Sequence, residues 1–121
     1  MAHQITTDPE KSLIHLVYSG TINLEERGRA RDEVFRLSRE QGLFRVLVDM
    51  SNCDIRMSAK DAVAFASVFR RAGLPPNYRL ACIIADSNEA ESLIESRVLM
   101  GQINIRYFDA AEQAHRWLQA V

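Results

Sequence analysis

The sequence has little of several features that would restrict its chemistry. Its 121 residues include two cysteines, three prolines and five glycines, and its formal net charge is −1. A chain with so little net charge has no general field that attracts nucleic acid, so we expect no nucleic-acid partner. The longest apolar run, residues 80–85, is far too short to cross a bilayer, so we expect neither a signal peptide nor stable membrane insertion.

Cysteine and histidine are too few and too scattered to mark a reaction centre. Cys53 and Cys82 lack metal-ligand spacing, and Cys82 lies in an apolar run that suits a small core residue. His3, His15 and His115 have no nucleophile motif near them, and the chain has no glycine-rich phosphate loop. We therefore expect a non-enzymatic protein without metal or cofactor. A reduced, cytoplasmic setting is the default for such cysteine usage.

What the chain does have is the composition of an ordinary soluble globule. Apolar residues make up 47% and charged residues 26%, and the length suits one domain over residues 1–121. Thirteen of the fifteen basic residues are arginine, which can indicate anion recognition. Several of them lie among acids between residues 25 and 40, and such mixed charge favours a solvent-exposed helix face. We expect that face to carry Arg27, Arg29, Arg31, Arg36 and Arg39.

Four helix starts share one pattern. Asn23, Ser58, Asn88 and Asp109 each stand three residues before an acid and just before an apolar pattern of helical period. The capping side chain accepts a free N–H of the first turn, and the acid reaches back to the cap. The pattern predicts four helices. The second has a typical inner stripe at Ala62, Phe65, Ala66 and Phe69, which favours a core role for both phenylalanines.

Strands are predicted before and between these helices. Residues 1–7 and 13–19 are close enough to pair as an antiparallel hairpin. Residues 44–50 and 79–85 are almost continuously apolar, which is typical of strands buried on both faces, whereas residues 103–108 alternate. Strands separated by helices run parallel. The prediction is an α/β fold with a mixed sheet of about five strands, one antiparallel at an edge and four parallel, with four helices.

The carboxyl ends of parallel strands are where open α/β sheets bind ligands. Asp49, Asp86 and Asp109 fall at these ends. One interpretation is a polar site for a phosphate or a divalent ion. The other is that the acids cap turns and helices, which a capping box already explains for Asp109. A metal-dependent enzyme at Asp49 and Asp86 is the least favoured hypothesis.

The polar segment after the third predicted strand is the favoured contact region. Ser58 at its end either caps the following helix, a contribution of roughly 1 kcal/mol, or accepts a phosphate that the helix N-terminus would stabilise. The candidate partner- or ligand-binding residues are Asp49, Ser51, Asn52, Asp54, Arg56, Met57 and Lys60.

Four stretches, residues 14–22, 46–52, 57–61 and 114–118, resemble the SpoIIAA-like proteins of the STAS group. This group includes anti-sigma-factor antagonists and the cytosolic tails of sulfate transporters, and the resemblance extends from about Gln4 to the end. It implies a mixed sheet with packed helices and a phosphorylated serine at the start of the helix after the loop. Ser58 matches that serine, although Met57 stands where these proteins have Asp and Ala59-Lys60 replaces their small residues.

Two functions follow as hypotheses. The first is a non-enzymatic regulatory module, of a bacterial type, that binds a protein partner through the 49–58 loop and the second helix. The alternative comes from the similar organisation of CRAL-TRIO lipid-binding domains, and it is a carrier or sensor of a small apolar ligand or lipid. Phe65, Phe69 and Met57 would line its site. Apolar residues off the predicted inner stripes, such as Val63 and Val68, also suggest a homodimer.

Overall fold

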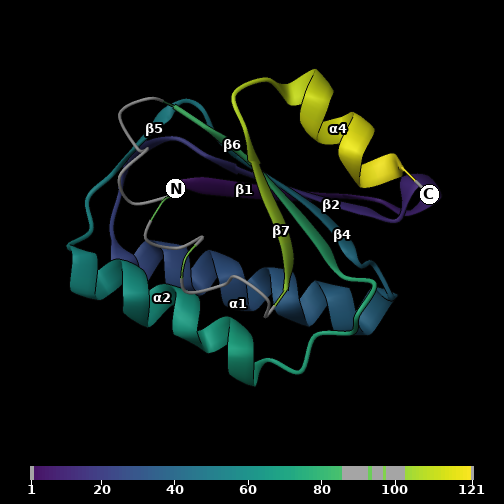
Figure 1. Cartoon of the computed structure of the whole chain (residues 1–121), viewed down its shortest axis with the longest axis horizontal. Coiled ribbons are helices and arrows are strands. Elements are labelled where there is room, and N and C mark those ends of the chain that lie inside the picture. The colour runs from purple at the N-terminus through teal and green to yellow at the C-terminus, as the bar shows by residue number, and fades with distance from the viewer. Residues whose placement is uncertain (1, 86–92, 94–96, 98–102, 121) are drawn as a thin grey trace.

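A computed structural model describes residues 2–85, 93, 97 and 103–120 of the chain. Local sequence explains how the elements begin and end, and Figure 1 shows their arrangement. The elements are β1 (His3–Asp8), the 3-10 helix η1 (Pro9–Lys11), β2 (Leu13–Tyr18), β3 (Gly20–Ile22), α1 (Leu24–Gln41), β4 (Arg45–Met50), β5 (Cys53–Ile55), α2 (Ala59–Arg71), β6 (Arg79–Ile84), β7 (Asn104–Phe108) and α4 (Ala111–Gln119).

The main sheet has five strands in the order β1-β2-β4-β6-β7. Strand β1 runs antiparallel to β2, and the other neighbours are parallel. This confirms the predicted mixed sheet, including its antiparallel edge strand. Helices α1 and α2 lie side by side on one face of the sheet, and α4 lies on the other (Figure 1).

The described residues contain three α-helices rather than the predicted four, because the helix expected around residues 88–100 falls almost wholly outside them.

Two predicted caps are confirmed. Asn23 accepts a hydrogen bond from the Glu26 N–H, and Ser58 forms a complete capping box with Asp61. The prediction for the last helix is wrong by one residue. Ala110, not Asp109, is its N-cap, and no side chain caps it.

The larger hydrophobic core fills the space between the sheet and helices α1 and α2. The whole predicted stripe of α2 is buried there, so the core role of Phe65 and Phe69 is confirmed. The Phe69 ring centroid lies 5.2 Å from that of Phe35 and 5.6 Å from that of Phe65, in edge-to-face contacts that add to simple burial. A smaller cluster lies under α4 and comprises Leu13, Leu47, Ala81, Ile83, Ala114 and Leu118.

None of the helices that the structure describes is both long enough and apolar enough to span a bilayer.

Candidate functional site

The segment between β4 and α2 is not the simple loop that the sequence predicts. Residues 53–55 form strand β5, which pairs in parallel with β3 in a separate two-stranded sheet. Cys53 and Ile55 are buried, and the Arg56 N–H extends the contact by donating to the Ile22 carbonyl at 2.7 Å. The segment is therefore fastened to the body of the fold at its middle. Sequence reasoning missed β5 because three residues carry too little periodicity to predict a strand.

Before β5, Asp49 stabilises the turn that leaves the sheet. One of its carboxylate oxygens accepts hydrogen bonds from the Ser51 N–H at 2.9 Å and from the Ser51 hydroxyl at 2.5 Å. This arrangement satisfies the backbone of a tight turn and supports the capping interpretation of Asp49. Asn52 beside it is exposed. Further on, the half-buried Asp54 forms an exposed ion pair with Arg56, with an N–O distance of 2.6 Å.

The start of α2 is exposed, and hydrogen bonds between Ser58 and Asp61 hold its first turn. The Ser58 hydroxyl accepts a hydrogen bond from the Asp61 N–H at 3.0 Å, and the Asp61 carboxylate accepts one from the Ser58 N–H at 3.4 Å. Ser58, Ala59 and Lys60 are all exposed. The capping role of Ser58 is thus confirmed, and its phosphorylation stays a prediction.

We name one group of exposed side chains the α2-start surface. It consists of Ser51, Asn52, Arg56, Ser58, Ala59 and Lys60. Three of the predicted contact residues lie apart from it. Asp49 and Asp54 are half-buried and bonded within the segment, and Met57 is half-buried and points inward, where its sulfur accepts from Arg27 at 3.9 Å. Of the seven candidates, four are therefore exposed: Ser51, Asn52, Arg56 and Lys60.

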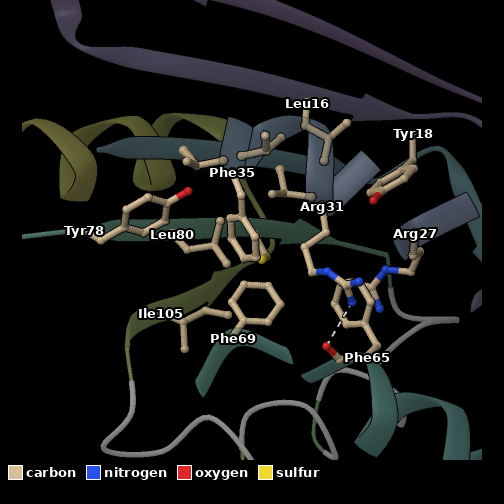
Figure 2. Close-up of a pocket in the computed structure, with 14 residues that line it drawn as sticks. Leu16, Tyr18, Arg27, Arg31, Phe35, Phe65, Phe69, Tyr78, Leu80 and Ile105 are labelled. Atoms are coloured by element: carbon tan, nitrogen blue, oxygen red, sulfur yellow. Dashed lines mark hydrogen bonds between the residues drawn. The ribbon is translucent and has the colours of Figure 1, made fainter. Parts of the chain in front are cut away.

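Phe65 and Phe69 line an internal pocket between the sheet and the two helices (Figure 2). Its cavity volume is about 30 Å³, in a lining that is almost entirely apolar. That is room for about one water molecule, whereas ligand sites typically measure about 300–1,000 Å³. Of the three residues predicted to line a ligand site, Phe65 and Phe69 meet here and pack against each other, whereas Met57 is not part of the lining.

Two arginines enter this pocket from α1, contrary to the prediction of an exposed helix face. Arg27 is 3% exposed, and its guanidinium carbon lies 3.9 Å from the Phe65 ring centroid. That of Arg31 lies 5.0 Å away, and its Nη1 donates to the Phe65 carbonyl at 3.2 Å. Figure 2 shows both guanidinium groups beside the Phe65 ring. These cation–π contacts bind α1 to α2.

A signal for this inward pair exists in the sequence. Arg27 and Arg31 stand three residues before and one residue after Ala30, and they complete an i, i+3, i+4, i+7 stripe with Val34. Ala30 and Val34 belong to the larger hydrophobic core, so this stripe is the inner side of α1. The charge composition did not indicate that Arg27 and Arg31 turn inward. Arg29 and Arg36 on the same helix do form the expected exposed ion pairs with neighbouring acids.

Two buried titratable side chains near this region, Cys53 and Tyr78, are held neutral. Burial raises the pKa of the Cys53 thiol to about 11, which leaves it protonated and a poor nucleophile at neutral pH. Burial likewise raises the pKa of Tyr78 to about 12, and its hydroxyl lies 3.1 Å from that of Ser38. Across the described residues, no cluster of three or more His, Cys, Asp or Glu side chains could hold a metal ion. Asp86, the second acid of the least favoured hypothesis, lies outside the described residues.

Comparison with known proteins defines the class of fold. The chain is similar in structure to an uncharacterised protein of the DUF3478 family from Shewanella loihica PV-4, whose fold is described as SpoIIAA-like. The TM-score is 0.59 at 16% sequence identity, and the match covers 97% of this chain and 92% of that one. No protein-family model and no curated protein sequence matches the chain. The chain therefore has a SpoIIAA-like fold, as the resemblance in its sequence predicted.

Proposed function

We propose that this chain is a STAS-type regulatory module that binds a protein partner through the α2-start surface. The observation that carries the proposal is a fixed, exposed polar segment on a SpoIIAA-like fold. The β3–β5 ladder anchors it at its middle and the Ser58 capping box anchors its end, so its backbone is held in place before a partner arrives. Such preorganisation lowers the entropic cost of binding.

The chemistry of the surface suits a protein partner with an acidic or hydrogen-bonding epitope. Arg56 and Lys60 supply positive charge, and Ser51 and Asn52 supply polar groups that can donate or accept. One turn into α2, Val63 is 44% exposed and adds an apolar contact. Arginine is one of the residues that protein interfaces favour.

Ser58 would act as the regulatory position of this surface. Its hydroxyl is exposed and stands at a helix N-terminus, where a phosphate is electrostatically favoured. Phosphorylation would exchange the hydroxyl for a dianionic group between Arg56 and Lys60 in the sequence. We propose that this change alters partner affinity while the helix start stays capped.

Affinity capture with a matched control tests the binding surface. The tagged protein is incubated with native lysate, and captured proteins are quantified by mass spectrometry for wild type, Arg56→Glu, Lys60→Glu and Arg116→Glu. Arg56 and Arg116 are equivalent in exposure, at 71% and 72% of the side chain, and each pairs with one nearby acid. Arg116 lies on α4, on the other face of the sheet.

The expected result is a set of proteins captured by wild type and Arg116→Glu but lost with Arg56→Glu and with Lys60→Glu. The loss should correspond to about tenfold weaker binding or more, because charge reversal replaces attraction by repulsion. Identical protein sets for all four variants would contradict the proposal. Thermal unfolding of each variant checks that the fold is retained.

The carrier hypothesis has less support from the geometry. A cavity of about 30 Å³ accepts a lipid only if α2 moves away from the sheet, and that movement would break the contacts among Phe35, Phe65 and Phe69. Native mass spectrometry of freshly purified protein discriminates between the two functions. A bound small molecule at constant stoichiometry would favour a carrier, and a ligand-free spectrum would favour the binding module.

A further inference from the structure

We propose that this chain forms a twofold-symmetric homodimer by pairing the outer edges of two β1 strands. Strand β1 is an edge of the main sheet and bonds to β2 on one side only. Within the part of the chain that the structure describes, no strand pairs with its other side. An edge of six residues presents a row of backbone donors and acceptors that another strand can bind.

The register of β1 and β2 identifies the groups on this edge. The Ser19 N–H donates to the Ala2 carbonyl at 2.9 Å, so this pair of opposed residues is a hydrogen-bonded one. In an antiparallel ladder such pairs recur at every second residue. The even-numbered residues of β1 therefore bond to β2. The backbone groups of His3, Ile5 and Thr7 point outward.

The sequence of β1 lacks the usual protection of an edge. It contains no lysine and no proline, the residues with which proteins commonly block edge pairing. Its centre, Ile5-Thr6-Thr7, is instead β-branched throughout and favours an extended strand. The edge is thus suited to pairing with another strand.

The spacing of the outward groups fits a second copy of the same strand. In antiparallel self-pairing, an outward residue must face an outward residue. An axis at Ile5 meets this condition at every position, since Ile5 faces its own copy and His3 faces Thr7. The Ile5 side chain is partly buried against the main core, so the pairing would join two cores with an apolar contact.

Charge next to the edge is also self-complementary. Arg29 and Glu33 of α1 line the same surface hollow as Ile5. A twofold axis at Ile5 would bring Arg29 of each copy toward Glu33 of the other. Arg29 is exposed and Glu33 is half-buried, and among the described residues both form ion pairs within α1, of a kind that contributes little to stability and can exchange partners. This complementarity favours a second copy over an unrelated strand.

Thr7→Pro tests the backbone pairing. The substitution removes an outward N–H and places a proline ring where the second strand would lie, whereas the bonds from β1 to β2 come from other residues. Thr7 is exposed, so little packing is lost. Sedimentation velocity over micromolar to millimolar protein concentrations should show a wild-type dimer and a dimer at least about tenfold weaker in Thr7→Pro.

A charge exchange tests the orientation of the two copies without altering β1. Arg29→Glu should weaken the dimer, because it places like charges across the axis, and the double variant Arg29→Glu/Glu33→Arg should restore it. Arg116→Glu is the control for net charge and should have no effect. If Thr7→Pro fails to fold, the double variant still tests whether the two copies pair about an axis at Ile5.

Two results would overturn the proposal. One is a wild-type protein that is monomeric at all concentrations. The other is a dimer that neither Thr7→Pro nor Arg29→Glu weakens, since its interface would then lie elsewhere. Neither result bears on the α2-start surface, whose test uses Arg56 and Lys60.

Discussion

The two faces of the main sheet are packed in different ways. The face under α1 and α2 has a continuous core with three phenylalanines in edge-to-face contact, and two arginines close one end of its pocket. The face under α4 has a small aliphatic cluster, because this nine-residue helix packs mainly over β4, β6 and β7. Beyond this cluster the face also carries polar side chains, among them the exposed Gln4 and Thr6 and the half-buried His15.

The difference indicates that the two faces of the sheet contribute unequally to the stability of the fold. Apolar burial contributes in proportion to area, so the α1–α2 face should supply most of the free energy of folding. The α4 face should open more readily, because fewer buried contacts hold its helix. The predictions below test this division, beginning with the largest effect.

The largest effect is expected from the aromatic contacts of the larger core. Phe69→Ala should lower the free energy of unfolding by about 3–5 kcal/mol, because it leaves a cavity between Phe35 and Phe65. Leu118→Ala under α4 should cost about 2–3 kcal/mol, the low end for such a change, since the short helix can relax into the space. Urea unfolding measures both values.

Hydrogen exchange separates the two variants further. Leu118→Ala should accelerate exchange in residues 111–119 far more than in α1, whereas Phe69→Ala should accelerate it throughout the chain. Phe69→Leu is the control, because it keeps most of the apolar volume and should lose less stability. Equal losses with uniform exchange in both alanine variants would show that the two faces form one cooperative unit.

An intermediate effect is expected at the starts of α2 and α4. Ser58→Ala should cost about 1 kcal/mol, because it removes the side chain that accepts from the Asp61 N–H. Ala110→Ser should instead stabilise the protein by about 0.5–1 kcal/mol. It supplies the side-chain cap that Ala110 cannot form at the start of α4, and it creates a capping box with Gln113 three residues on. Thermal and urea unfolding check both signs, and no gain for Ala110→Ser would mean that the backbone at the start of α4 does not suit a cap.

The smallest effect concerns pH and His15. Burial lowers the pKa of His15 below its ordinary value of 6.5. Asp49 opposes this shift, and His115 of α4 adds to it. The unfolded chain therefore binds more protons around and just below pH 6.5, so stability should fall as the pH decreases through this range. His15→Gln should reduce that dependence when urea unfolding is compared between about pH 5 and pH 7.5.

Glu26 provides a control that titrates in a different range. Its pKa is lowered from 4.5, chiefly by the hydrogen bond with His3, whose Nδ1 lies 2.6 Å from the Glu26 carboxylate. The stability from this contact is present above pH 4.5 and is lost as the pH falls below it. Glu26→Gln should thus alter the dependence below pH 4.5 and leave the His15 range unchanged. A stability that rises on acidification from pH 7 to pH 5 would contradict the His15 prediction.

Much of this arrangement could be predicted from the sequence because it rests on local periodicity. The apolar stripe of α2, the buried strands β4 and β6, and the caps at Asn23 and Ser58 each depend on residues within one or two helical turns. The last helix shows the limit of such patterns. Asp109 has the right spacing for a cap, yet α4 begins after Ala110, whose backbone is extended and whose side chain forms no capping bond.

The candidate surface was predicted in part. Ser51, Asn52, Arg56 and Lys60 are exposed as a polar segment suggests, and hydrogen bonding draws Asp49 and Asp54 back into the segment itself. No local pattern indicated β5. Its partner β3 lies about thirty residues earlier, and three residues form a strand only when a partner satisfies their backbone.

By itself the sequence determined the sheet, the helices it could cap, and the resemblance to a SpoIIAA-like fold. Only the tertiary structure decided that residues 53–55 anchor the predicted loop and that Arg27 and Arg31 point inward to Phe65. The physical reason is the same in both cases. Periodicity and capping are set by neighbours along the chain, whereas strand pairing and the burial of a charged side chain depend on groups that only the folded chain brings together.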